Sequence, residues 1–530
     1  MTPSVPVIDA DVAVIGSGFA GSLAALALLK RGQRVALVER GRHPRFAIGE
    51  SSTPLANLLI EELADRYDLP AIRVFSKWGS WQRARPEISC GLKRGFSFFF
   101  HQPGEAFSDG PDHARQLLVA ASPHDDIADT HWYRPEFDLA LAREAESAGA
   151  IYLDATRLDR LHHDGDGWSI AGDREGRPVF VKAGFIIDAS GPRGFLHRAL
   201  SLGEIPLRWL PATQALYTHF EGVERWDRQG HSPEQPPYPI DEAAVHHVFP
   251  GGWIWILRFN NGLTSAGAAL TDSLAGEIGA ADGAAAWSRL LATLPSIADQ
   301  FGSSRPVMPF VHAPRIAFRS ARAAGPGWAL LPSAAGVIDP LLSTGFPLTL
   351  LGVLRLVDLL EHSVPGSDRD AALGAYERST LAELDATERL VGALYATMDD
   401  PPLFKRLSLM YFAAASFSET VRRLGRPGQA PGFLLREHPV FGPELEACAS
   451  LAASRPRGLA REALEARIDR AIEPFDTAGL LDRRRRDWYP VVAGDLLASG
   501  AKLKATPDEI LHLLQRSGMM PGAPTTQESS

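Results

Sequence analysis

The stretch "DVAVIGSGFAGSLAALALLKRGQRVALVER", residues 11–40, decides the fold of the first part of this 530-residue chain. An apolar run passes through a glycine-rich turn into an Ala/Leu-rich segment, and a second apolar run ends at Glu39. Alternating runs of this kind predict a strand, a helix and a second strand of one parallel sheet.

The turn in this unit has the pattern G-x-G-x-x-G, formed by Gly16, Gly18 and Gly21. The first glycine permits a tight turn, the second lets a pyrophosphate approach the backbone, and the third lets helix and strand pack closely. Glu39 stands where a carboxylate accepts a hydrogen bond from an adenosine ribose. The pattern therefore predicts a site for FAD or NAD rather than NADP, with an ordinary strand–helix turn as the structural alternative.

Composition and charge limit the partners of the chain. Hydrophobic residues make up 45% of it, which is typical of a globular protein, and the net charge of -9 is spread along the sequence. A spread acidic charge argues against a nucleic-acid partner. Two distant cysteines, Cys90 and Cys448, suggest a reducing compartment, so we expect a cytoplasmic protein.

Membrane and metal sites are not expected either. The apolar segment 328–354 contains prolines, glycines and an aspartate, and the N-terminus has no basic region typical of a secretory signal. His162–His163 and His246–His247 are adjacent pairs, whose side chains point to opposite faces of a strand. We therefore predict no membrane span and no metal site.

Four later stretches extend the pattern. They are "RHPRFAIGESSTP" (42–54), "YRPEFDLALAREAESAGA" (133–150), "FIIDASGPRG" (185–194) and "AAGVIDPLLSTG" (334–345). Together with the glycine turn they resemble, in this order, the FAD-dependent monooxygenases of the para-hydroxybenzoate hydroxylase type. The resemblance covers residues 10 to about 350, and it implies FAD. The cofactor-binding residues that we predict are Gly16, Gly18, Phe19, Ala20, Gly21, Glu39, Arg40, Gly49, Glu50, Ser51, Asp188, Ser333, Asp339, Gly345 and Phe346.

Within that superfamily, four segments resemble the flavin-dependent halogenases. "IGESSTP" (48–54) is similar to their flavin-covering loop, and "KRGFSF" (93–98) matches their K-x-G-x-x-F pattern. "GWIWILRF" (252–259) resembles their W-x-W-x-I-P signature, and "DPLLSTG" (339–345) resembles the segment that holds a halide beside the flavin.

This second resemblance implies roles for five residues. Lys93 would end a tunnel from the flavin and activate hypohalous acid, as a haloamine or through a hydrogen bond. Thr344 and Gly345 would hold chloride or bromide, and Trp253 and Trp255, on one face of a strand, would keep the substrate from the flavin. These residues also have structural interpretations. Lys93 could simply precede a strand, Thr344 could cap a helix, and the two tryptophans could be ordinary core aromatics.

The chain departs from the halogenase patterns at three places. Leu257-Arg258 stand where the signature has Ile-Pro, and Pro332-Ser333 stand where most relatives have Gly-Asp, with Ser333 as a substitute for the aspartate. Leu342 stands where tryptophan halogenases have a glutamate, which points away from free tryptophan as substrate. The resemblance thus favours a phenol or pyrrole, free or bound to a carrier.

The fold class that we predict is α/β (α+β). A Rossmann-like FAD-binding domain (1–200 and 310–360) would receive an inserted antiparallel β-sheet substrate domain (201–309), because short β-rich runs lie between about 205 and 270. A mainly helical C-terminal region (361–520) and a disordered tail (521–530) would follow.

The function predicted from the resemblance is halogenation of an electron-rich aromatic, with reduced FAD, O2 and chloride or bromide. Since no NAD(P)H site is evident, a separate flavin reductase would supply the reduced FAD. One alternative is a flavin monooxygenase that hydroxylates an aromatic, including a tryptophan within a protein substrate. Another is a reductase-type flavoprotein such as the prenyl reductases.

Overall fold

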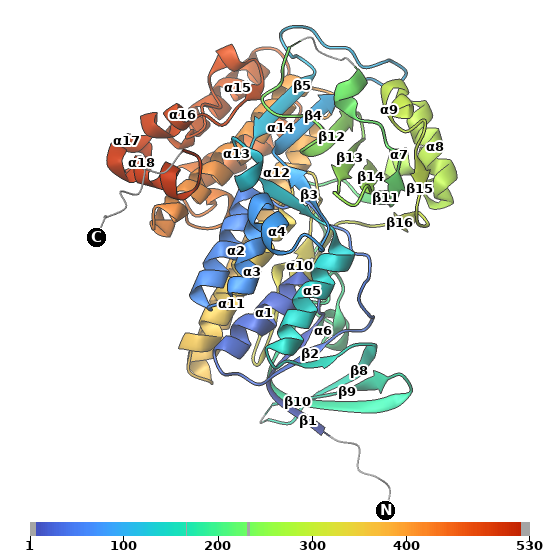
Figure 1. Ribbon diagram of the computed structural model, residues 1–530, viewed down its shortest axis with the longest axis vertical. Helices are drawn as coiled ribbons and strands as arrows, with labels where there is room; N and C mark the ends of the chain where they lie inside the picture. The colour runs from blue at the N-terminus through green and yellow to red at the C-terminus, as the bar shows by residue number, and fades with distance from the viewer. Residues whose placement is uncertain (1–6, 166, 230–233, 521–530) are drawn as a thin grey trace, which may run out of the picture.

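The first of two large sheets carries the nucleotide-binding unit. A computed structural model describes residues 7–165, 167–229 and 234–520 (Figure 1). Strands β1 (Val7–Ile15), β2 (Val35–Val38), β7 (Ile151–Leu153), β10 (Arg177–Asp188) and β19 (Trp328–Leu330) pair in parallel in the order β19-β10-β1-β2-β7. The sheet is completed by β8 (Thr156–His163), β9 (Trp168–Arg174) and β18 (Ala324–Gly325). The predicted Rossmann-like fold is confirmed.

Helix α1 (Phe19–Lys30) connects β1 to β2, as the sequence predicted. Its first ten residues are all buried, because it lies between the sheet and the helices α5 (Arg134–Ser147) and α11 (Gly345–His362) (Figure 1). A helix covered on all sides can be apolar all round, which explains its Ala/Leu composition.

The second sheet contains the predicted antiparallel strands. These are β11 (Thr213–Glu221), β12 (Ala244–Phe249), β13 (Gly252–Arg258) and β14 (Thr264–Thr271), with β15 (Arg305–Pro306) and β16 (Val311–Ala313) at the edge. Strands from outside 201–309 complete it, since β4 (Gly95–Phe100) pairs in parallel with β12, then β5 (Gln116–Ala120) and β21 (Trp488–Tyr489) follow. Every residue of β4 is buried, so this aromatic strand needs cover on both faces.

The C-terminal region is helical, as predicted. Its main helices are α12 (Ser367–Ala396), α13 (Pro401–Arg423), α14 (Phe441–Ala453), α15 (Leu459–Ile472), α16 (Ala493–Ala498), α17 (Gly500–Leu503) and α18 (Pro507–Arg516). Helix α13 packs on α2 (Pro54–Arg66), and its Phe412 meets Phe96 of the second sheet edge to face. The C-terminal helices therefore pack both on α2 of the nucleotide-binding part and on the second sheet. The predicted tail 521–530 lies outside the described residues (Figure 1).

Shorter elements complete the fold. Strands β3 (Cys90–Lys93) and β6 (Asp129–Trp132) form one two-stranded sheet, and β17 (Phe318–Arg319) and β20 (Gly336–Val337) form another. The remaining α-helices are short: α3 (Pro70–Arg73), α4 (Trp78–Ala84), α6 (Phe195–Ala199), α7 (Asp272–Glu277), α8 (Ala284–Ala292), α9 (Pro295–Gln300) and α10 (Pro332–Ala335). None of the helices in the described ranges has the length and apolar character needed to cross a membrane.

Candidate active site

A cavity of about 520 Å³ lies between the two sheets, and we call it the flavin cavity. Its lining comes from segments that are distant in sequence. They are Gly18–Ala20, Arg45–Ser51 with Arg134, Ala189–Pro192, the inward side chains of the second sheet, Arg315 and Ile316, residues from Pro332 to Thr349, and Leu384. The chain thus brings together the glycine turn and the segments that carry the resemblance.

The glycine turn has the backbone geometry that its pattern predicts. Gly16 has φ +100°, and a Cβ there would lie 2.6 Å from the Ala189 carbonyl oxygen. A Cβ on Gly21 would lie 1.9 Å from the Gly16 carbonyl oxygen. Gly18 is the N-cap of α1 and lines the cavity together with Phe19 and Ala20. The helix N-terminus therefore faces the cavity, as a pyrophosphate site requires.

Glu39 is buried at the end of β2. Its carboxylate accepts hydrogen bonds from the backbone N–H groups of Ser17 (3.1 Å) and Gly41 (2.9 Å) and from Arg45 (3.2 Å). Burial alone would raise the pKa of Glu39, but Arg45 and the two N–H donors outweigh it and hold the pKa below its usual value. Glu39 is thus an ionised acceptor next to Arg45 of the cavity wall, but neither Glu39 nor the exposed Arg40 lines the cavity itself.

Two arginines that the sequence analysis missed stand over the start of α1. The Nη2 atoms of Arg45 and Arg134 and the Oδ2 atom of Asp138 each lie 3.6 Å from the position of a Cβ on Gly18. Asp138 holds Arg134 in a two-point ion pair of 2.8 and 2.7 Å, and Arg134 also donates to the Gly49 carbonyl. Two cations at a helix N-terminus suit a diphosphate. The i, i+4 spacing of Arg134 and Asp138 within "YRPEFD" was the available signal.

The loop 49–51 closes one side of the cavity. Gly49 has φ +88°, Glu50 accepts from the ring of His219 (3.0 Å), and Ser51 lines the cavity. Asp188 does not line it. Its carboxylate accepts from the backbone of Ser190 (2.8 Å) and so shapes the lining loop 189–192 from behind.

Another part of the cavity wall is formed by the segment 332–346. Ser333, the residue predicted to substitute for an aspartate, lines it at the start of α10. Asp339 is buried and accepts from the backbone N–H of Leu341 (2.9 Å) and the hydroxyl of Tyr395 (2.9 Å). Burial raises the pKa of Asp339 to about 7, although both hydrogen bonds act in the other direction.

The N-terminus of α11 also opens into the flavin cavity. Thr344 is its N-cap, Gly345 is its first residue, and both line the cavity with Phe346. The Thr344 side chain makes no capping hydrogen bond, so the alternative of a structural cap is not realised. Free backbone N–H groups at such a terminus attract an anion, which is what the predicted halide role of Thr344 and Gly345 needs.

Trp253 and Trp255 both line the flavin cavity, with ring centroids 5.7 Å apart. The indole N–H of Trp253 donates to the Tyr395 hydroxyl (3.2 Å), which connects the pair to Asp339 through α12. Arg258 points away, since it donates to Asp241 (3.0 Å) on the far face. The departure from the halogenase signature at Arg258 therefore lies outside the cavity.

Lys93 is fully buried at the end of β3. Its Nζ donates to the carbonyl of Ser52 and lies 3.7 Å from the centroid of the Phe96 ring. Burial lowers the pKa of Lys93, and the carboxylate of Asp129 on the facing strand opposes that change. An ammonium so poorly solvated is readily converted to a nucleophilic amine.

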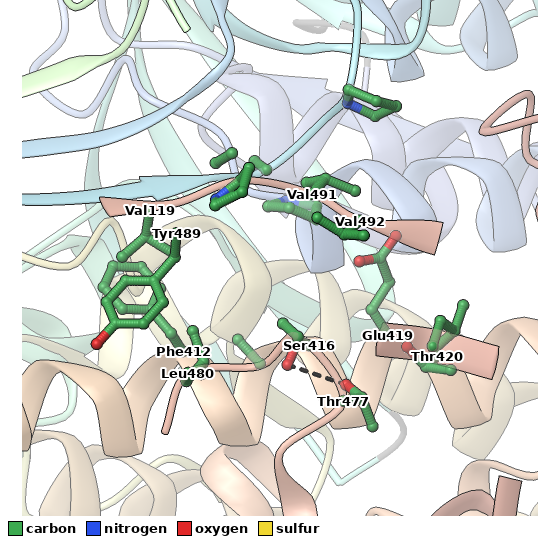
Figure 2. A pocket seen from close by; sticks show the side chains of 18 of the residues that line it. Val119, Phe412, Ser416, Glu419, Thr420, Thr477, Leu480, Tyr489, Val491 and Val492 are labelled. Atoms are coloured by element: carbon green, nitrogen blue, oxygen red, sulfur yellow. Dashed lines mark hydrogen bonds between the residues drawn. The ribbon is translucent and has the colours of Figure 1, made fainter. Parts of the chain in front are cut away.

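A second pocket of about 190 Å³ lies against α13, and we call it the α13 pocket (Figure 2). Most of its lining is apolar, and Ser416 and Thr477 share a hydrogen bond at its floor. Among the described residues that line it, Glu419 is the one with a charged side chain. The others include Thr53, Pro54, Phe96, Val119, Tyr411, Phe412, Leu480, Tyr489, Val491, Val492, Ala493, Leu496, Leu514 and Met519. No sequence motif indicated this pocket.

Lys93 is not among the residues that line either space, but its contacts lie between the two. Ser51 lines the flavin cavity, Thr53 lines the α13 pocket, and the carbonyl of Ser52 between them accepts from Lys93. Phe96, below Lys93, lines the α13 pocket and stacks on His246, which lines the flavin cavity (centroids 5.9 Å apart).

The residues of the flavin cavity fit FAD. Arg45 Nε and Ser51 Oγ are buried and have no hydrogen-bond partner in the described part of the chain, although both side chains line the cavity. Buried donors of this kind normally have a partner, and a polar cofactor would provide one.

Comparison with known proteins agrees with this geometry. The family model for FAD dependent oxidoreductases matches residues 11–338. Monodechloroaminopyrrolnitrin halogenase PrnC of Pseudomonas fluorescens is 32% identical over 399 residues, which are 74% of this chain and 68% of the relative. The chain belongs to the flavin-dependent halogenase family.

Two further relatives support the assignment of this halogenase. Tetracycline 7-halogenase of Kitasatospora aureofaciens is 29% identical over 420 residues, 76% of this chain and 73% of the relative. The crystal structure of halogenase PltM in complex with phloroglucinol and FAD matches with a TM-score of 0.79 at 25% identity, over 90% of this chain and 99% of the other. The predicted family, the FAD cofactor and the halogenation of an aromatic are confirmed.

Proposed function

We propose that this halogenase modifies an uncharged, electron-rich aromatic of one or two rings that carries an O–H or N–H group and binds in the α13 pocket. The observation that carries the proposal is the position of Lys93, whose carbonyl partner Ser52 separates the flavin cavity from the α13 pocket. A reactive halogen species held at Lys93 would meet a ring bound on the other side.

The size and polarity of the pocket support this substrate class. A dry cavity of about 150 Å³ binds benzene, so a pocket of about 190 Å³ suits one or two rings. Its largely apolar lining disfavours a charged ring. PltM, crystallised with phloroglucinol, shows that a fold of this kind accepts a small uncharged phenol.

Glu419 gives the pocket one strong acceptor. Arg423 donates to its Oε1 (2.8 Å) and so fixes the carboxylate, which points toward Val492 across the pocket (Figure 2). We assign Oε2 to the O–H or N–H group of the substrate. Such a hydrogen bond to a carboxylate increases the electron density of the ring and orients it.

Different residues of the chain serve the separate steps of the proposed reaction. Bound reduced FAD would supply, with O2 and halide, the oxidising power that forms hypohalous acid. The N-terminus of α11 at Thr344 and Gly345 binds the halide, and Trp253 and Trp255 separate the ring from the flavin cavity. Lys93 holds the hypohalous acid by a hydrogen bond or as a haloamine and presents the halogen to the ring.

The partners follow from the same site. A separate flavin reductase would supply reduced FAD, and the ring would arrive free or on a carrier protein. Cys90 and Cys448 are both buried free thiols, which supports our inference of a cytoplasmic location.

The test is halogenation by the purified protein with FAD, a flavin reductase, NADH and bromide, using phenols, anilines and pyrroles as free compounds and as carrier thioesters. Brominated products are expected by mass spectrometry. Lys93→Met should abolish them while oxidation of reduced flavin continues.

Lys405→Met is the matched control, because Lys405 is also a buried lysine, but it forms an ion pair with Asp487 and contacts none of the residues that join the two spaces. This variant should retain bromination. Products that gain oxygen, and that persist in Lys93→Met, would overturn the proposal and show a hydroxylase.

A further inference from the structure

Asp129 lies directly opposite Lys93 in the small sheet of β3 and β6. The two residues are register partners in this antiparallel pair, so their side chains stand on the same face. Both are buried, with exposed fractions of 0% for Lys93 and 4% for Asp129. A carboxylate and an ammonium are thus enclosed side by side between the flavin cavity and the α13 pocket.

The carboxylate of Asp129 is only partly satisfied. Asn57 of α2 donates to its Oδ1 (2.7 Å), while Oδ2 is buried without a hydrogen-bond partner in the described part of the chain. Native structures rarely leave a buried carboxylate oxygen unpaired. An oxygen in this state, beside an amine, is positioned to accept a proton.

The other titratable groups around the pair do not replace Asp129. His131 on β6 and His246 on β12 have pKa values below the usual range, first because of burial and then because of Lys93. Tyr411 on α13 has its pKa raised by burial. Glu419, also on α13, is paired with Arg423, which in turn donates to Glu61 of α2 (3.1 Å).

We propose that Asp129 exchanges a proton with Lys93. The Asp129 carboxylate takes up the proton when Lys93 becomes a neutral amine, and it returns the proton when the ammonium is needed. The inference rests on the proposed role of Lys93. Asp129 does not touch the ring, so it is a positioning residue that acts through Lys93.

The proton balance is the same for both ways in which Lys93 can act. Overall, the ring and hypohalous acid give the halogenated ring and water: the carbon–halogen bond forms, the oxygen–halogen bond breaks, and the ring proton ends on the hydroxide. In the haloamine route the neutral amine attacks the halogen, the nitrogen–halogen bond forms as the oxygen–halogen bond breaks, and the hydroxide leaves as water with a proton from the nitrogen. The ring then takes the halogen from nitrogen, and the ring proton returns to that nitrogen through the carboxyl group of Asp129. In the hydrogen-bond route the ammonium protonates the departing hydroxide and must be recharged. Both need a reversible proton store at Lys93.

Burial reduces the free-energy difference between the charged and the neutral form of the Lys93–Asp129 pair. Two full charges in a poorly solvated site are costly, whereas a neutral amine beside a neutral carboxylic acid is not. Burial lowers the pKa of Lys93 and raises the pKa of Asp129, so the charged and neutral forms of the pair approach each other in free energy.

The test is the pH profile of bromination by the Asp129→Asn variant. Because the carboxylate raises the pKa of Lys93, its removal should move the Lys93-dependent limb of the profile to lower pH. Turnover should fall about 10-fold or more, as for loss of general acid–base assistance. Oxidation of reduced flavin should be unchanged.

A second measurement works without turnover. Reductive methylation by formaldehyde and a borane modifies only neutral amines, and peptide mass spectrometry can follow Lys93 in flavin-free protein. Methylation of Lys93 should begin at a lower pH in Asp129→Asn than in the wild type. Asn57→Ala, which removes a donor that favours the charged carboxylate, should change the profile less.

Asp241→Asn is the matched control. Asp241 is buried and ion-paired with Arg258, outside both spaces, so its loss should leave both pH profiles in place. If Asp129→Asn has wild-type profiles, Asp129 is purely structural and the inference is wrong. If Lys93→Met still brominates, the proposed function itself fails.

Discussion

The flavin cavity and the α13 pocket lie on two sides of Lys93, but they are built in different ways. The flavin cavity depends on backbone shape, as in the φ of +100° at Gly16 and the start of α11, which has no side-chain cap from Thr344. The α13 pocket depends on side-chain volume, from residues such as Phe412 and Leu496.

This difference explains why only one of the two left a sequence signature. A backbone turn tolerates few residue types, so it repeats as a motif. An apolar wall tolerates many residues of similar size, so it does not. Cofactor binding should therefore be sensitive to single small substitutions, whereas substrate binding should respond mainly to volume and to Glu419.

The largest effect is expected from Gly16→Ala. Its Cβ would meet the Ala189 carbonyl and require a strained φ, a combined cost of at least about 3 kcal/mol, which is roughly a 100-fold loss of FAD affinity. Flavin fluorescence titration measures the loss. Gly32→Ala is the control, since Gly32 has φ +75° but open space around it, and its FAD affinity should stay close to wild type. Equal losses of FAD affinity in both variants would show that the close backbone approach at Gly16 is not what FAD binding requires.

The next effect tests the volume of the α13 pocket. Ala493→Phe places a ring into it from the start of α16, and kcat/KM for bromination should fall about 10-fold or more because about one ring of space is lost. Ala498→Phe, at an exposed position on the same helix outside the lining, should have little effect. FAD affinity should be unchanged in both. A normal kcat/KM in Ala493→Phe would place the substrate elsewhere.

A moderate effect is expected from Glu419→Gln. Loss of a hydrogen bond to a charged acceptor costs about 1.5–3 kcal/mol, so kcat/KM should fall about 10- to 150-fold for a phenol. The same ring without its O–H group should lose less. Glu62→Gln is the control. Glu62 of α2 forms an ion pair with Arg422, which lies on the same helix as Glu419, but Glu62 does not line the pocket. An equal loss for both substrates would remove Glu419 from substrate recognition.

The smallest effect concerns the hydroxyl of Tyr395, which connects Asp339 and Trp253 within the wall of the flavin cavity. Tyr395→Phe removes the hydrogen bonds to Asp339 and Trp253 and should lower the free energy of unfolding by about 1 kcal/mol in denaturant titrations.

The pH dependence of that loss has a definite sign. The pKa of Asp339 is raised by burial to about 7, so its contribution to stability is greatest below about pH 4 and declines as pH rises through 7. Since the Tyr395 hydroxyl favours the ionised carboxylate, the loss in Tyr395→Phe should be larger at pH 8 than at pH 5. A loss independent of pH would mean that Asp339 does not titrate in this range.

Several parts of the site could be predicted because their signals are local. Gly16, Gly18 and Gly21 belong to one turn, and Trp253 and Trp255 belong to one strand. By contrast, Tyr395 meets Asp339 across 56 residues, and Asp129 meets Lys93 through the pairing of β3 with β6. Neither pair has a spacing that a sequence pattern can detect.

The second sheet shows the same limit. The antiparallel strands between 205 and 270 follow from alternating β-rich runs, but β4, β5 and β21 join them from outside 201–309. The buried aromatic run of β4 indicated a strand that needed cover on both faces, without indicating its partner β12.

The sequence by itself determined the nucleotide-binding unit and the position of Lys93 in the chain, because each depends on residues close together in sequence. It also indicated FAD, through the resemblance of several separate segments to known flavoproteins. The tertiary structure decided what surrounds that lysine. Burial between two spaces, the facing carboxylate of Asp129 and the walls from α13 and residues 477–519 all arise when distant segments pack. The reactivity of an amine depends on those surroundings more than on its neighbours in the chain.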